Sequence, residues 1–441
     1  MSSIGGPPWQ LPAMLLLGAA FSQLVASVVL ASAAGDLARG MFLGPQELEL
    51  VHLYGLATLS VAIFAVLLQL VPVILRQRVP FERVAGVAAA GVLVGAWLMA
   101  LALGRNDTEY AAAGGALFGV GGVILIALVG MAVVRAAGAR NLGDTGIGLA
   151  AALVWFAVVI VLGGSLLDNL RAPLLGTLTL RVLAAHALIA GLGWIGGAIV
   201  AVVLRLGPML ALAHGHSQRP GRIALVAWHL GVLGIAAGLI AGSRYVVVAG
   251  ALALAVAVGA LGTYLAGVVR HRNRRLEAPT VHLAIGAIAT AAASGAIVGA
   301  ATGVVPALDV VIPAGLCILI GLGAGVTSGH LFKILPMIVW TGRFAGLAGT
   351  GHAPRLSDMY PARLALAEQA AFAAGMLALV TGCIAHTPGL AAVGGDLVAL
   401  AAALTLIAAG IIVARTPHPA RGVESGASPS WHGQVTAADG H

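Results

Sequence analysis

Charged residues are scarce in this chain of 441 residues. Asp, Glu, Lys and Arg make up only 9% of it, whereas hydrophobic residues make up 60% and the mean hydropathy is +1.04. A soluble domain carries about a quarter charged residues. A chain with so few charges cannot cover a water-facing surface, so the composition excludes a soluble globular protein and indicates an integral membrane protein.

Cysteine is nearly absent, and several common motifs are missing. The only two cysteines, Cys317 and Cys383, lie within apolar segments, which excludes a disulfide framework and a CxxC site. No Walker A, HExxH or CxxCH motif occurs, so we do not expect a covalently attached c-type haem. The first apolar segment lacks a basic region before it, and we expect it to be retained as a span.

Long apolar runs fill most of the chain. They show no alternation of apolar and polar residues, which favours helices over strands. We predict a short cytoplasmic N-terminus over 1–11, a transmembrane domain over 12–414 and a disordered cytoplasmic tail over 415–441. The predicted spans are 12–34, 47–75, 84–104, 112–137, 147–167, 179–204, 222–241, 245–269, 280–303, 310–332, 363–386 and 392–414.

The distribution of basic residues predicts the orientation. If the N-terminus is cytoplasmic, 18 of the 23 basic residues (23 minus 5) fall on the cytoplasmic side. Such a split follows the positive-inside rule, which explains the net charge of +8 better than nucleic-acid binding does. We therefore predict a multi-pass protein of the cytoplasmic membrane with both termini inside. The five exceptions are Arg39, Arg105, Arg171, Arg181 and Arg244.

A short phrase ending in proline recurs at the inner ends of the second, sixth and tenth spans. Its prolines, Pro72, Pro208 and Pro336, are 136 and 128 residues apart (208−72 and 336−208). The period is four helices, and four is even, so the chain is predicted to contain three parallel sets of four helices. Inverted-repeat transporters would not show this pattern.

Two histidines lie near the outer ends of the first two repeated spans. His52 is 20 residues before its proline and His186 is 22 before its own (72−52 and 208−186), a distance of about 30 Å along a helix. Neutral imidazole is a common ligand for haem iron and copper. Small neighbours such as Gly55 and Gly191 would leave room for a macrocycle. The alternative is a pair of core histidines in tightly packed helices.

Other residues are weaker candidates. Cys317 lies at the matching depth of span ten, where a thiolate ligand and a buried inert thiol are both open. His229 and His330, toward the inner face, are candidates for a second metal site or a proton path, and a hydrated position at the headgroup interface is the equal alternative for both. His282 is expected at the headgroup interface, and His214 with His216 in a solvated loop.

Acidic residues are rare at depth. Glu368 is the best intramembrane carboxylate candidate, and either pairing with Arg363 or contact with water could satisfy it.

The twelve spans, the three sets of four and a histidine near the outer end of span two resemble subunit I of the haem-copper oxidases. The phrases around His52 to Pro72, around His186 to Pro208 and in Gly329 to Pro336 are similar to those of the NnrS-like membrane proteins. The resemblance implies a haem-copper oxidase-like helical fold and non-covalent haem b, with copper a further option. It also implies a quinol or cytochrome redox partner, other membrane subunits and a role in the nitric-oxide response.

The resemblance does not extend to an oxygen-reducing copper–haem centre. Span ten carries no outer histidine, and Ala190 stands four residues after His186, where the oxidases have a tyrosine. We therefore expect one haem held by His52 and His186. A twelve-helix transporter without a cofactor and a cofactor-free scaffold remain alternatives.

Overall fold

A computed structural model describes residues 8–274 and 277–417. It confirms the prediction of a multi-pass helical membrane protein, because twelve helices in this part are long and apolar enough to cross a bilayer, and no strand occurs in it. The predicted tail from residue 418 onward lies outside the described residues.

Three of the twelve spans are built from more than one helical segment, and short 3-10 turns accompany the loops. Span two is Pro45–Leu75, span six Gly176–Ala211 and span ten Ala307–Arg343. The elements are α1 (Gln10–Ala38), α2 (Pro45–His52), η1 (Leu53–Ser60), α3 (Val61–Leu75), α4 (Glu82–Gly104), α5 (Thr108–Gly138), α6 (Gly143–Arg171), η2 (Gly176–Leu178), α7 (Thr179–Leu188), η3 (Ile189–Gly196), α8 (Gly197–Ala211), α9 (Arg219–Ala241), α10 (Arg244–Arg270), α11 (Ala278–Thr302), α12 (Ala307–Leu316), η4 (Cys317–Ala324), α13 (Gly325–Arg343), η5 (Ala345–Leu347), η6 (Leu356–Asp358), α14 (Ala362–Ile384) and α15 (Pro388–Ala414).

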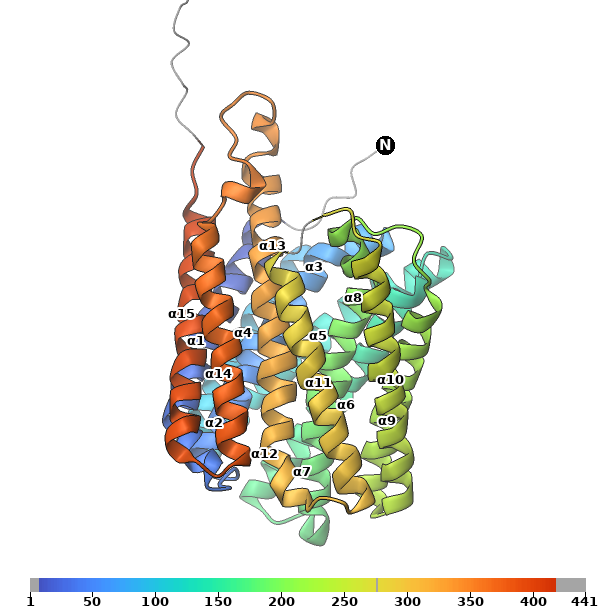
Figure 1. Cartoon of the computed structure of the whole chain (residues 1–441), viewed down its shortest axis with the longest axis vertical. Helices are drawn as coiled ribbons and strands as arrows, with labels where there is room; N and C mark the ends of the chain where they lie inside the picture. The colour runs from blue at the N-terminus through green and yellow to red at the C-terminus, as the bar shows by residue number, and fades with distance from the viewer. Residues whose placement is uncertain (1–7, 275–276, 418–441) are drawn as a thin grey trace, which may run out of the picture.

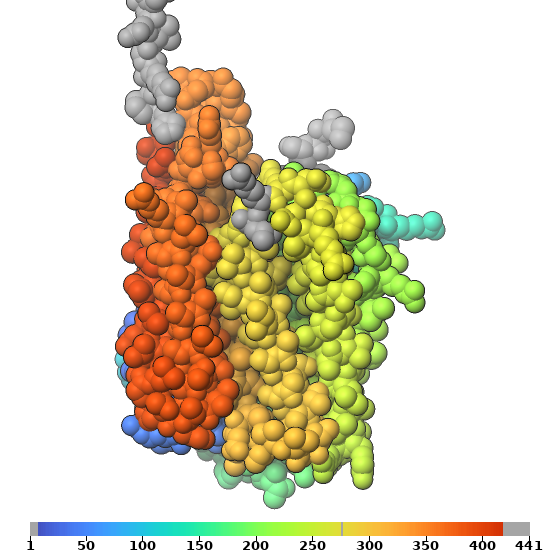
Figure 2. All heavy atoms as spheres, in the orientation of Figure 1, coloured from blue at the N-terminus to red at the C-terminus, as the bar shows by residue number. Residues whose placement is uncertain are grey.

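The helices form one elongated bundle, with α1 beginning and α15 ending at the same end (Figure 1). We call this end A, and the opposite end B. Spans two, six and ten form the centre: their most apolar stretches are 72%, 72% and 67% buried, against 22–56% for the other nine. Side chains of α14, α15, α11 and α10 fill the gaps between the peripheral helices in the space-filling view (Figure 2).

Each central span is interrupted by a π-helical segment. All three segments, η1, η3 and η4, begin 19 residues and end 12 residues before the proline of their span. They contact one another at the middle of the bundle. The wider π turn frees backbone carbonyls, some of which find side-chain donors: the Thr58 hydroxyl donates to the Leu53 carbonyl at 3.0 Å, and the Trp228 indole donates to that of Leu192 at 2.8 Å. The identical register supports the predicted threefold repeat.

The three hairpins that follow the central spans in the chain repeat a close glycine contact. α4 packs on α5, α9 on α10 and α14 on α15. In each hairpin two glycines lie 19 residues apart, and a Cβ on either would collide with the backbone of the other helix. Because glycine has no Cβ, the backbones of the two helices can pack in direct contact. The glycine pairs are Gly95 with Gly114, Gly231 with Gly250, and Gly375 with Gly394.

Span ten is longer than the sequence predicts. We expected it to end near 332, but α13 continues to Arg343 beyond Pro336. The extension is held at its end, because the Arg343 guanidinium donates to the carbonyls of Val413 and Arg415 at 2.9 and 2.5 Å and lies 4.8 Å from the Trp9 ring centre. A helix end stabilised by such contacts does not need to stop at the membrane boundary.

Candidate functional site

His52 lies at end B, immediately before the π-helical segment η1. Its Nδ1 donates to the Leu48 carbonyl at 2.7 Å, which fixes the ring and leaves Nε2 available. Three residues on, a Cβ added to Gly55 would meet no atom within 4 Å, so the chain leaves open space on this side of span two. The arrangement suits a ligand that approaches Nε2.

His186 lies in the same region, near the start of span six. It is close enough to His52 for the two rings to interact electrostatically. Its ring packs beside α6, where a Cβ on Gly163 would lie 3.1 Å from the Cε1 atom. The Nδ1 atom is buried without a close hydrogen-bond partner, although the Val159 backbone of α6 lies near enough to interact with the ring. An unsatisfied buried ring nitrogen costs about 1–3 kcal/mol, and a metal bond is one way to satisfy it.

His52 and His186 are the two histidines that the structure brings together at end B. The described residues contain no group of three or more His, Cys, Asp or Glu side chains placed to hold a metal ion. Cys317 packs among Ala289, Ala293 and Ala314, small residues of α11 and α12. The structure gives that thiol the surroundings of a buried core residue.

His229, on α9, occupies a site of its own. The Trp155 indole donates to its Nδ1 at 3.1 Å, so the proton of the neutral ring is on Nε2. Nε2 is buried without a partner, and the ring packs against Gly197 of span six. An Nε2 that carries a proton would have to lose it before binding a metal.

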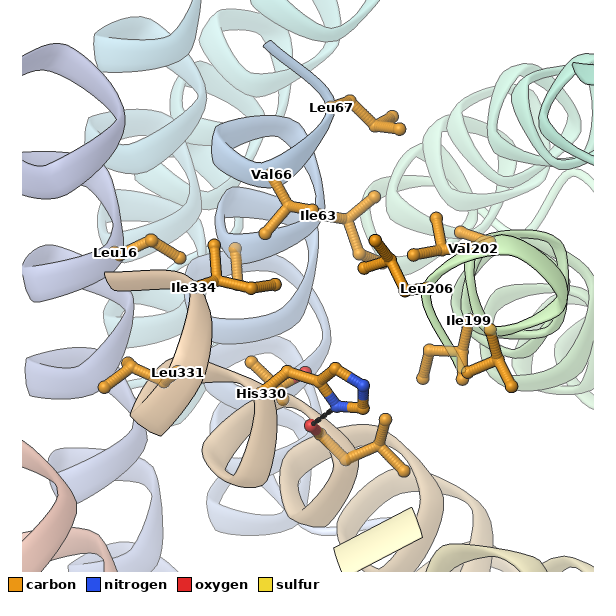
Figure 3. Close-up of a pocket in the computed structure, with 15 residues that line it drawn as sticks. Leu16, Ile63, Val66, Leu67, Ile199, Val202, Leu206, His330, Leu331 and Ile334 are labelled. Atoms are coloured by element: carbon orange, nitrogen blue, oxygen red, sulfur yellow. Dashed lines mark hydrogen bonds between the residues drawn. The ribbon is translucent and has the colours of Figure 1, made fainter. Parts of the chain in front are cut away.

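His330 lies toward end A and points into a cavity of about 70 Å³ (Figure 3). Its Nδ1 donates to the Val326 carbonyl at 2.8 Å, as the dashed line shows. The cavity lies between spans two, six and ten, so this histidine is not grouped with His52 and His186.

His282 and Glu368 form a buried hydrogen-bonded pair that sequence reasoning missed. The prediction that His282 lies at the headgroup interface is wrong: the residue is fully buried, and its Nε2 lies 3.1 Å from the Glu368 Oε2 atom. The Thr405 hydroxyl donates to Oε1 at 3.4 Å. The structure thus gives Glu368 a partner other than the two that we predicted, Arg363 and water. The sequence contained a clue to this pairing, because both residues lie within two turns of a helix start at end A.

Gly329 makes room for this pair. A Cβ at that position would collide with the His282 ring, and the Phe372 ring lies 5.4 Å from the imidazole on another side. The His282 Nδ1 contacts the Ala278 carbonyl at 3.2 Å and must donate to it. Nε2 then either donates to the carboxylate or accepts from the carboxylic acid, so the pair shares one proton in both cases.

The loop histidines form a small cluster outside the spans. Burial, with the nearby His271 and His214, holds the pKa of His216 below its ordinary value. The ring centres of His216 and His271 are 6.5 Å apart. Because the folded state disfavours protonated His216, the unfolded chain binds that proton first as pH falls. This contribution to stability is therefore present above about pH 6.5 and is lost below it.

We expect removal of one neighbour to reverse part of this shift. His271→Ala should raise the pH midpoint of His216, measured by NMR titration of its ring, because a repelling charge is gone. His352→Ala, in a different loop, serves as the control and should leave the midpoint unchanged. An unchanged midpoint in His271→Ala would rule out this cause.

Comparison with known proteins adds no relative: no protein-family model matches this chain, and no curated protein matches it.

Proposed function

We propose that this chain is a haem-binding membrane redox protein, in which His52 and His186 would hold the haem. The observation that carries the proposal is the orientation of His52: Nδ1 is anchored to the Leu48 carbonyl, and Nε2 is free beside open space at Gly55. Metal-binding histidines commonly donate their second ring N–H in this way. The Nδ1 atom of His186, which is buried without a close hydrogen-bond partner, would supply a second nitrogen ligand in the same region.

The chain's own residues would bind and orient such a group. Leu48 and Leu56, on the His52 side of span two, pack against a hydrophobic cluster that includes Met99 and Leu167. These apolar side chains would exclude water from one side of the ligand. A bound haem b supplies one-electron redox chemistry and an iron that binds small gases. The proposed role is electron transfer from a quinol or cytochrome, or nitrogen-oxide chemistry; copper has no converging ligand set among the described residues.

An absorption spectrum tests this proposal. We expect protein expressed with added haem to show a Soret band and sharp reduced bands after dithionite, and His52→Ala to lose them. His271→Ala is a matched control, since this loop histidine makes the same contact, from Nδ1 to the carbonyl four residues earlier, at 2.9 Å. The spectrum of that variant should match the unaltered protein.

A cofactor-free transporter is the second candidate, favoured by the cavity between the three central spans. The same experiment separates the two. A well-folded, colourless protein that takes up no haemin would contradict the haem proposal and favour transport of a small solute.

A further inference from the structure

The cavity at His330 is lined in the same register by all three repeats. In each central span the residues ten, nine, six and five positions before the proline line it. Position nine holds Ile63, Ile199 and Thr327, and position six holds Val66, Val202 and His330. Figure 3 shows side chains from the three spans converging on this space. Because equivalent residues of all three repeats form the lining, the cavity follows from the threefold repeat and not from a local packing defect.

The cavity ends at the π-helical segments on its end B side. Position thirteen before the proline holds Leu59, Ile195 and Gly323 in the three spans. A Cβ on Gly323 would lie 2.6 Å from the Leu59 Cδ1 atom and 3.6 Å from the Ile195 Cγ2 atom. The three equivalent residues therefore meet and close the cavity on its end B side.

The lining offers very little to a polar molecule. His330 uses its Nδ1 proton on the Val326 carbonyl, so Nε2 presents only a lone pair to the cavity. Thr327 contributes the only other polar side chain among the residues that line it. A buried water needs two to four polar partners, and apolar cavities of this kind stay dry and bind xenon or small hydrocarbons.

Size sets the limit on what fits. A volume of about 70 Å³ is several times the roughly 10–15 Å³ that one water molecule requires on the same measure. A charged molecule would lose its hydration against walls that cannot replace it. A haem or a peptide is too large.

We propose that this cavity is a binding site for one small, uncharged, mainly apolar molecule, held beside the His330 Nε2 atom. The inference is independent of the haem proposal, because it depends on neither His52 nor His186. The single imidazole, where the other repeats have valine, gives the site a nitrogen lone pair, and Thr327 adds the other polar side chain.

Xenon is the probe for this site. We expect crystals of the full chain under xenon pressure to show an anomalous peak beside His330. Val202→Phe, which places a ring in the cavity, should abolish the peak. Val256→Phe, on the exposed face of α10, should retain it.

Three results would overturn the proposal: ordered water filling the cavity, a lipid chain occupying it, or no xenon there while other apolar sites are filled. If Val202→Phe does not fold, the map of the unaltered protein decides between these results and the expected peak.

Discussion

Gly250→Ala is expected to destabilise the bundle by about 2–3 kcal/mol, although alanine is the better helix former. Its Cβ would collide with the backbone nitrogen of Ile235 and lie 2.9 Å from the Gly231 carbonyl oxygen. Backbone atoms cannot move aside as a flexible side chain can, so α9 and α10 must separate. The thermal midpoint in detergent, followed by the fluorescence of the buried Trp228, measures the loss.

Gly259→Ala, on the same helix, is the matched control. A Cβ there would meet no atom within 4 Å, so the substitution should be neutral or stabilise by about 0.5–1 kcal/mol through helix propensity. Replacing glycine with alanine is thus expected to lower stability at one position of α10 and to leave it unchanged or raise it at the other. Equal shifts in the two variants would show that close backbone packing at Gly250 is not what holds the hairpin.

The second large effect is expected at the buried His282–Glu368 pair. His282→Leu should cost about 3–5 kcal/mol, because it leaves the Glu368 carboxyl group in the bundle interior with only the Thr405 hydroxyl at 3.4 Å. The free energy of unfolding in a mild detergent provides the measurement. As a comparison, Asp144→Asn breaks the exposed pair with Arg222 and should cost less than about 1 kcal/mol.

The double variant His282→Leu/Glu368→Leu distinguishes the cost of an unpaired group from the value of the pair. Removing both polar groups leaves no uncompensated charge, so much of the lost stability should return. A double variant as unstable as the sum of both single variants would mean that the two residues act independently, contrary to the geometry.

Several features of the fold could be predicted because they depend on local sequence. Hydropathy predicts all twelve spans, and the spacing of Pro72, Pro208 and Pro336 predicts the threefold repeat that the π-helical segments support. The π-helical segments themselves could not be predicted. Leu53–Ser60 is as apolar as an ordinary helix, and the change in hydrogen bonding leaves no mark on composition.

The candidate site was only partly accessible to sequence reasoning. His52 and His186 do lie in one region at end B, as their matched depth predicts, and their role as haem ligands stays a prediction. The environment of His282 could not be read from its neighbours in sequence, because its partner lies 86 residues away on α14. Hydropathy reports how deep a residue lies along a span, but not which way its side chain faces.

The sequence by itself determined that this chain enters a membrane, how many times it crosses and that its helices form three repeats of four. Those properties follow from composition and periodicity, which act through the bilayer on each segment separately. Only the tertiary structure decided that glycines 19 residues apart meet, that His282 pairs with Glu368 and that His330 faces a cavity. Such contacts depend on the rotation and spacing of helices that are distant in the chain, and packing of the whole bundle sets both.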